Sequence, residues 1–310
     1  MALDVTGLTK YTDEHSGALI KEAILTGRTV DMVTVQGGVK HSATVNTLSS
    51  ALTAQAGACG WNAAGSTILD QRTIEVSPIK INEPICLNTL EEYYTSVMMN
   101  PGSYNQEIPF EQMFAENKAE AVKSLMEDLI WKGDKVAGTG NLALANGFIK
   151  LFDDAETAGD LTRVGTYTIA NFAADAIDIV DEAIAELPDS VLGLDDLVVM
   201  LSYADYRKYA KAVRDANLFH YTGAENQGED FMQIHPGTNV KVIATKGLAG
   251  SNKFLVAPAS NLVVGTDLLN DTEDFRIFYS QDNDEVRFLA KFKVGVQVAF
   301  IDNVVWYTGV

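Results

Sequence analysis

The sequence contains few of the residues from which metal sites and disulfide frameworks are built. It has two cysteines, Cys59 and Cys86, and four histidines in 310 residues. Neither cysteine has a histidine or a second cysteine at metal-ligand spacing, and the histidines form no helical pair, so no metal site is predicted. Two free thiols are the expectation for a reducing compartment, with a disulfide between them as the alternative.

Positive charge is also scarce. Lys and Arg total 23 against 42 Asp and Glu, which gives a formal net charge of −19 and a sequence pI near 4.5. Such a balance opposes adhesion to nucleic acid and to anionic lipid, and it keeps an abundant protein soluble. One expected helix is a local exception, since it carries Arg207, Lys208, Lys211 and Arg214, and we predict salt bridges between subunits or plain solvation for them.

Long apolar runs are missing as well. No run approaches 18 residues, so no membrane-spanning helix and no membrane partner are predicted. The first residues lack the basic and apolar segments of a signal peptide, and we expect folding in a cytoplasm. Core-forming residues are ample, because 47% of the chain is hydrophobic and 21% is charged, as in folded proteins with one large domain or two ordinary ones.

No pattern of catalytic residues emerges. There is no Gly-x-Ser-x-Gly elbow, and no pair of carboxylates stands out from the acidic background. Gly138 and Gly140 lack the preceding strand and the following Gly-Lys-Ser/Thr of a phosphate loop. The acidic clusters at 153–154 and 282–285 do not fit a calcium-binding loop. We therefore predict no catalytic, cofactor-binding or metal-binding residues, no cofactor and no enzymatic activity.

The clearest positive feature is a long helix expected over 109–132. Pro109 suits the first helical position, and Gly133 suits a C-terminal stop. Apolar residues including Leu129 fall on one side of the helical wheel, and charged residues including Glu127 fall on the other. We expect a mostly solvated helix that bridges two differently composed halves of the chain.

Before this helix the sequence predicts β-strands that are interrupted by a segment of mostly small residues. Residues 28–36 alternate, a Gly-Gly pair follows at 37–38, and alternation then resumes, which is a β-hairpin signal. Residues 49–66 are small and suit a tip or a surface connection. Short helices are expected at about 12–27 and 89–99. Because a β-excursion of this kind has few large apolar residues, we expect it to rest on another surface, such as a neighbouring subunit.

After the long helix the pattern changes to α/β. An amphipathic helix is predicted over 169–187, and a buried strand is predicted to end near Ser202. Ser202 and Asp205 form a near capping box that should open a helix to about residue 215. Strand patterns then recur throughout the C-terminal third.

The order of these parts resembles the major capsid proteins of tailed bacteriophages, which have the Hong Kong 97-type fold. Four local features carry the resemblance along nearly the whole chain. They are the glycine-rich turn Gly133-Asp134, Gly138-Thr139-Gly140-Asn141-Leu142 and Asn146-Gly147-Phe148; the strand and helix of Leu197 to Tyr206; the passage Gly237 to Leu255; and Lys291, Lys293 and Gly295 near the family's R-x-G segment.

The resemblance implies an α+β fold with an arm, an extended loop and two domains. The implied parts are an N-terminal arm with a short helix (1–27), an extended β-loop (28–85), the first part of a peripheral domain with the spine helix 109–132 (86–140), an axial domain (141–250), and a closing β-rich segment shared by the peripheral and axial domains (251–310).

The same resemblance implies a structural protein that self-assembles as hexamers and pentamers. The icosahedral shell would enclose double-stranded phage DNA, bound without sequence specificity, and would form in the host cytoplasm to become the virion capsid. The extended loop would lie over the neighbouring subunit. Because the arm begins almost at Met1, a separate scaffolding protein is expected, together with portal and minor capsid or decoration proteins.

Two other functions stay open on the sequence. One is an encapsulin-type nanocompartment shell, which would share the fold. The other is an acidic α+β hydrolase or binding protein, which would share only the composition.

Overall fold

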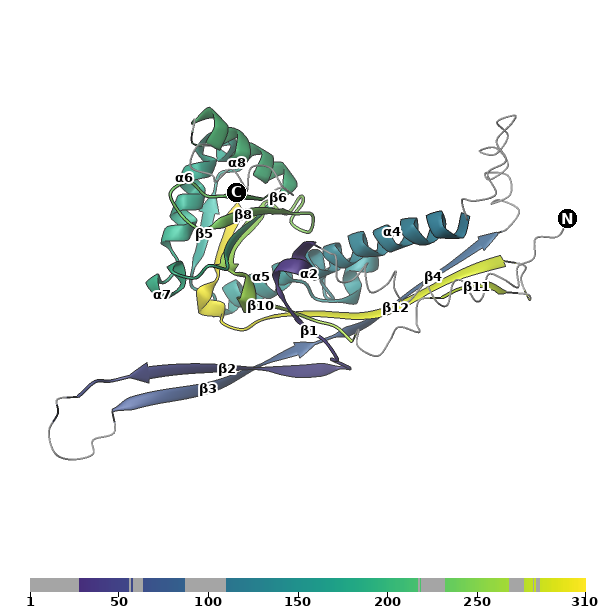
Figure 1. The fold of residues 1–310 in the computed structure, drawn as a ribbon, viewed down its shortest axis with the longest axis horizontal. Helices are drawn as coiled ribbons and strands as arrows, with labels where there is room; N and C mark the ends of the chain where they lie inside the picture. Colours follow the sequence, from purple (N-terminus) through teal and green to yellow (C-terminus); the bar gives the residue numbers. More distant parts are fainter. Residues whose placement is uncertain are drawn as a thin grey trace.

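Two β-sheets and one long helix form the body of the protein, and a two-stranded hairpin projects from it (Figure 1). The helices are α2 (Arg28–Met32), α4 (Phe110–Lys132), α5 (Phe148–Ala158), α6 (Phe172–Ala185), α7 (Asp189–Leu192) and α8 (Tyr203–Asp215). This computed structural model describes residues 28–55, 57, 64–86, 110–216, 218, 232–267, 276–280, 282 and 285–310.

The strands fall into three sheets. A five-stranded sheet has the order β1-β10-β12-β11 with β4 also on β12, a six-stranded sheet has the order β5-β13-β9-β6-β8-β7, and β2 pairs with β3. The strands are β1 (Thr34–Gln36), β2 (Ser42–Leu52), β3 (Gly65–Glu75), β4 (Ser77–Cys86), β5 (Val164–Tyr167), β6 (Leu197–Ser202), β7 (Met232–Ile234), β8 (Lys241–Thr245), β9 (Lys253–Pro258), β10 (Leu262–Gly265), β11 (Arg276–Ser280), β12 (Glu285–Val298) and β13 (Val305–Gly309).

The long strand β12 organises the five-stranded sheet. Its first part lies between β11 and β4, and its last part pairs with β10. Successive side chains of a strand point to opposite faces. Phe288 and Ala290 of β12 share one apolar cluster with Ile79 of β4 and Met126 of α4, so this face of the sheet packs on the long helix.

The six-stranded sheet is buried on both faces. Val199 and Leu201 of β6 lie in one cluster with α6 and α8, while Val198 and Met200 lie in the cluster that contains α4 and α5. β6 is buried at every position, which explains its continuous apolar sequence.

Aromatic side chains join the long helix to the six-stranded sheet. The ring centroids of Trp131 in α4 and Phe148 in α5 lie 5.4 Å apart, and those of Phe152 in α5 and Trp306 in β13 lie 5.0 Å apart. All four residues are fully buried. The two sheets therefore belong to one continuous packed body.

The predicted hairpin around Gly37-Gly38 is wrong. Residues 28–32 form the helix α2, and β1 pairs in parallel with β10, not with β2. Val30 and Val33 lie three residues apart and are both buried, so the alternating stretch uses helical spacing to fill the core. The true hairpin is β2–β3, whose strands are joined by residues 53–64.

The predicted long helix is confirmed as α4, which begins at Phe110 and ends at Lys132. Its predicted orientation is confirmed at Leu129, which is buried, and at Glu120, which is exposed, but it is wrong at Glu127. Val122, Met126, Leu129 and Ile130 are buried, and Glu127, which we placed on the solvated side, is only 6% exposed. The helix is therefore a core element along its C-terminal half.

The predictions after the long helix are largely confirmed. α6, β6 and α8 form where expected, and the side chain of Ser202 accepts a hydrogen bond from the backbone N–H of Asp205 at 3.1 Å. No helix was predicted at α5 and no strand at β5, which begins at Val164. Three other expectations, the helices at 12–27 and 89–99 and the state of Cys59, lie outside the described residues.

Candidate assembly surfaces

The hairpin formed by β2 and β3 is the most exposed part of the described structure. Its register runs from Ser42 opposite Glu75 to Leu52 opposite Gly65, and its strands form a two-stranded sheet of their own. Figure 1 shows it extending away from the body. Isolated two-stranded hairpins are marginally stable in water, so this one needs a surface to rest on.

Charge is absent from most of the hairpin. No Asp, Glu, Lys or Arg occurs from Ser42 to Leu69, although 21% of the whole chain is charged and its net charge is −19. Interface cores are depleted of charged residues. This segment can approach a second acidic copy of the chain with less repulsion than the rest of the surface. The sequence carried this signal, and the interpretation of 49–66 as merely small residues missed it.

Large apolar side chains gather on the same segment. Leu48, Leu52, Ile68 and Leu69 are 60%, 93%, 61% and 76% exposed. Directly opposed residues of an antiparallel pair share a face, and residues two apart along a strand do too. Leu48 lies opposite Leu69, so Leu48, Leu52 and Leu69 share one side, which we call the leucine face.

The base of the hairpin is fixed to β12. The side-chain amide of Gln297 donates a hydrogen bond to the Thr73 carbonyl at 2.8 Å, and Lys293 Nζ donates to the Lys40 carbonyl at 3.0 Å. At Gly295 the strands β12 and β3 cross so closely that a Cβ on this residue would lie 2.1 Å from the Glu75 carbonyl oxygen. The hairpin is therefore anchored at its root and exposed along its length.

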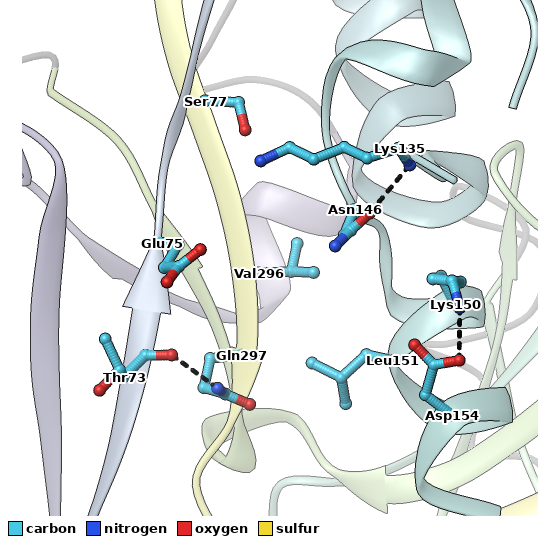
Figure 2. A pocket seen from close by; sticks show the side chains of 10 residues that line it. All are labelled: Thr73, Glu75, Ser77, Lys135, Asn146, Lys150, Leu151, Asp154, Val296 and Gln297. Atoms are coloured by element: carbon cyan, nitrogen blue, oxygen red, sulfur yellow. Dashed lines mark hydrogen bonds and ion pairs between the residues drawn. The ribbon is translucent and has the colours of Figure 1, made fainter. Parts of the chain in front are cut away.

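A groove of about 240 Å³ lies beside this root (Figure 2). Lys150 pairs with Asp154 on one side of it, and the Lys135 side chain reaches across toward Ser77. The mixture of amines, carboxylates and amides suits polar contact. We call it the basal groove, and it is lined by Thr73, Glu75, Ser77, Lys135, Asn146, Lys150, Leu151, Asp154, Val296 and Gln297.

A second groove, of about 340 Å³, lies on the five-stranded sheet where β4, β11 and β12 meet. In the register, Arg287 lies opposite both Pro84 and Phe278, and Leu289 lies opposite Asn82. Alternation places these residues on the face turned away from α4. We call it the sheet groove, and it is lined by Lys80, Asn82, Glu83, Pro84, Phe278, Arg287, Phe288 and Leu289.

The sheet groove combines apolar surface with positive charge. Lys80 lies directly opposite Lys291 in the register, on the same face as Arg287. Like charges at directly opposed positions are unfavourable in a sheet.

The buried polar groups of the body serve its structure. His235, 1% exposed, is bonded through Nδ1 to the Tyr209 hydroxyl at 2.7 Å and through Nε2 to Asp181 at 2.6 Å, which links the residue that follows β7 to α8 and α6. Burial raises the pKa of Tyr209 above its ordinary value, and nearby Asp181 adds to the rise. The described residues contain no group of three or more His, Cys, Asp or Glu side chains that could hold a metal ion.

The glycine-rich turn after α4 and the cations on α8 serve the packing and ion pairing of the fold. At Gly138 a Cβ would lie 2.2 Å from the Asp134 carbonyl oxygen, and at Gly147 it would lie 2.5 Å from that of Trp131, so this turn needs glycine for close packing. Two of the four cations on α8 form ion pairs, Lys208 with Asp205 at 2.9 Å and Lys211 with Asp215 at 4.0 Å. No helix in the described part of the chain has the length and apolar character to cross a membrane.

Comparison with solved structures decides the fold. A chain of the satellite phage P4 procapsid structure that includes the size determination (Sid) protein matches with a TM-score of 0.60 and 12% identity, over 99% of this chain and 91% of that one. The capsid of an empty GTA particle matches at 0.56 and 13%, over 92% and 90%. This chain has the fold of phage capsid proteins. A virus-like particle from Pyrococcus furiosus also matches, at 0.51 and 10%, over 95% and 98%.

The predicted α+β capsid fold is thereby confirmed. Its finer assignment as Hong Kong 97-type, with the arm, loop and domain boundaries given above, stays a prediction. No family model matches the sequence, and no curated protein matches it.

Proposed function

We propose that this capsid-fold chain is the major capsid protein of a tailed phage. The observation that carries the proposal is the similarity to capsid chains over nearly the full length of both partners, with almost no sequence identity. A fold alone hosts many functions. The exposed hairpin, which carries no charged residue from Ser42 to Leu69, supports the shell role independently, because it is an apolar surface that a single copy leaves uncovered.

The proposed assembly consists of hexamers and pentamers that close into an icosahedral shell around double-stranded DNA. In it, the hairpin lies over a neighbouring subunit, residues 86–140 and 141–250 belong to peripheral and axial domains, and the segment 251–310 contributes strands to both. Its further partners are a portal, a separate scaffolding protein and minor capsid or decoration proteins. The role is structural and not enzymatic, and the shell forms in the host cytoplasm.

A cellular protein shell is the second candidate. The similarity to the Pyrococcus furiosus virus-like particle favours it, because that match spans almost the whole of both chains. The excess of negative charge is compatible with a shell around DNA and with a shell around cargo protein, since neither requires sequence-specific contact with DNA.

Negative-stain electron microscopy of the full chain, purified alone and co-expressed with phage scaffolding protein, tests the shell role. Closed shells, or rings of five and six subunits, are expected. A uniform monomer under every assembly condition would overturn the proposal. Particles isolated from native cells then separate the two candidates, because nuclease-protected double-stranded DNA indicates a phage capsid and an enclosed cargo enzyme indicates a cellular shell.

A further inference from the structure

We propose that two copies of the chain pair with each other through the outer edges of their β3 strands. The contact is antiparallel, it joins residues 65–71 of both copies around a two-fold axis at Ile68, and it turns two hairpins into one four-stranded sheet. The inference rests on the proposed function, because it names a contact for the two-fold axes that a closed icosahedral shell contains.

The outer edge of β3 lacks the usual protection against pairing. In the described part of the chain β3 pairs only with β2, so its other side is open. Exposed edge strands are commonly protected by shortness, by proline or by charge. β1, β5 and β7 have three or four residues, and β4 carries Pro78 and Pro84. β3 has 11 residues, its first seven are all exposed, and it has neither proline nor charge from Gly65 to Leu69.

Hydrogen bonds show which residues of β3 face the open edge. The Gln71 N–H donates to a neighbouring carboxylate at 2.8 Å, and the Thr73 carbonyl accepts from a side-chain amide of β12 at 2.8 Å, so both residues turn away from β2. Alternate residues of a strand face the same edge, so Thr67 and Leu69 also turn outward. The outward N–H and C=O groups of these two residues have no partner among the residues that the structure describes.

These free backbone groups select the register of the contact. With Ile68 opposite Ile68 of the second copy, Thr67 lies opposite Leu69, and the two residues exchange both of their hydrogen bonds. The symmetry repeats this exchange on the other side of the axis. A register with Leu69 on the axis would instead pair Thr67 with Gln71, whose N–H is already bonded. The register centred on Ile68 therefore uses the groups that a single copy leaves unpaired.

The side chains suit the same register. Ile68 is 61% exposed, and the contact places it against its own copy as an apolar cross-strand pair. Asp70 lies opposite Ser66 of the second copy, whose hydroxyl can donate to the carboxylate. The two Asp70 residues are about 13 Å apart along the strands. A chain of net charge −19 can thus meet its copy with no like charges directly opposed.

The position of β3 leaves room for a second copy. Figure 1 shows that, toward the tip of the hairpin, β2 lies on the side facing the body and β3 lies on the side facing away. The joined sheet also explains how a marginal two-stranded hairpin becomes stable, because sheets of three or more strands with a hydrophobic face hold together on their own. Directly opposed residues point to the same side, so the leucine faces of both copies lie on one face of the joined sheet.

Disulfide trapping tests the register. In the full chain with Cys59→Ser and Cys86→Ser, Ile68→Cys should give a covalent dimer at twice the 33.6 kDa of one chain under mild oxidation. The two Cα atoms of a directly opposed pair without hydrogen bonds lie about 4.5 Å apart, which suits a disulfide. Ser66→Cys is the matched control, because it is also exposed but lies about 13 Å from its own copy along the strands. No dimer from Ile68→Cys, or equal amounts of dimer from both variants, would overturn the inference.

Charge at Ile68 tests the two-fold symmetry. Ile68→Lys and Ile68→Glu each place like charges directly opposite, so each variant alone should lose the contact, and an equimolar mixture should restore it. Amide hydrogen exchange at Thr67 and Leu69 measures the contact, because their outward N–H groups are unprotected in a single copy. We expect protection in the mixture and in neither variant alone. Equal exchange in the three samples would contradict a two-fold contact.

The two proposals can fail separately. If the parent chain forms shells and Ile68→Cys does not link, the edge pairing is wrong and the shell role stands. If the parent chain forms no shells, yet Ile68→Cys links and Ser66→Cys does not, the shell role fails and the edge pairing stands.

Discussion

The buried carboxylate of Glu127 accepts a hydrogen bond from the hydroxyl of Thr29, which lies 98 residues earlier in the chain. Trp131 Nε1 donates to the same hydroxyl oxygen at 2.8 Å. Thr29 and Trp131 are 0% exposed, and Glu127 is 6% exposed. The Thr29 hydroxyl therefore satisfies both the Glu127 carboxylate and the Trp131 N–H inside the core, and these two hydrogen bonds connect α2 to the long helix.

Replacing that hydroxyl should be costly. Thr29→Val keeps the shape of the side chain but leaves the Glu127 carboxylate and the Trp131 N–H without this partner, so we expect a loss of about 1–3 kcal/mol in the free energy of unfolding. Thr44→Val, on the exposed part of β2, is the matched control and should change stability by less than about 0.5 kcal/mol. Denaturant unfolding measures both, and equal effects would show that the buried network contributes nothing.

The stability of the protein should depend on pH through Glu127. Burial raises the pKa of this carboxyl above its ordinary 4.5, against the lowering effect of the hydrogen bonds from Thr29. A carboxyl whose pKa is higher in the folded chain stabilises the fold below its unfolded pKa, and that contribution is lost as the pH rises through the folded pKa. Glu127→Gln cannot titrate, so its stability relative to the wild type should improve as the pH rises above about 4.5. Denaturant unfolding across this pH range measures the difference, and a constant difference would contradict the prediction.

The crossing at the root of the hairpin requires glycine. In Gly295→Ala the new Cβ would lie 2.1 Å from the Glu75 carbonyl oxygen, so β3 and β12 must separate. Overpacking of this kind costs about 1–3 kcal/mol. Gly193→Ala has no heavy atom within 4 Å of its Cβ and should be within about 0.5 kcal/mol of the wild type. Thermal unfolding of both variants checks the contrast, and two equal melting temperatures would rule out the close crossing.

Lys293 should be the most important cation of the hairpin root. Its Nζ lies 2.6 Å from Asp267 Oδ2, and the side chain of Asp267 is only 7% exposed. The Lys293 side chain is 25% exposed, so the pair is partly buried, and removing the ammonium leaves the Asp267 carboxylate without this donor. Lys293→Met should therefore cost about 1–3 kcal/mol. Lys211→Met breaks a pair whose side chains are 67% and 61% exposed, and it should cost less than about 0.5 kcal/mol. Chemical denaturation distinguishes the two, and a small effect at Lys293 would mean that Asp267 finds another donor or water.

Local patterns predicted the elements whose burial follows from their own sequence. The long helix, the buried strand before Ser202 and the capped helix after it all formed as expected, because stop and cap residues such as Gly133 and Ser202 act within one turn of the chain. The predicted α+β capsid fold followed from the order of such elements. The exposed hairpin could also have been anticipated from its missing charges.

Pairing and orientation were decided by the tertiary structure. Residues 28–36 alternate like a strand, yet their partner is β10, more than two hundred residues later, and Thr29 and Val30 turn into the core as part of a helix. A helical wheel cannot show that Thr29 would satisfy Glu127, so the carboxylate was placed on the wrong side. The sequence by itself determined which segments are helix, strand and turn, because those choices depend on near neighbours. Only the tertiary structure decided what each segment packs against, because that depends on partners which the chain brings together only when it folds.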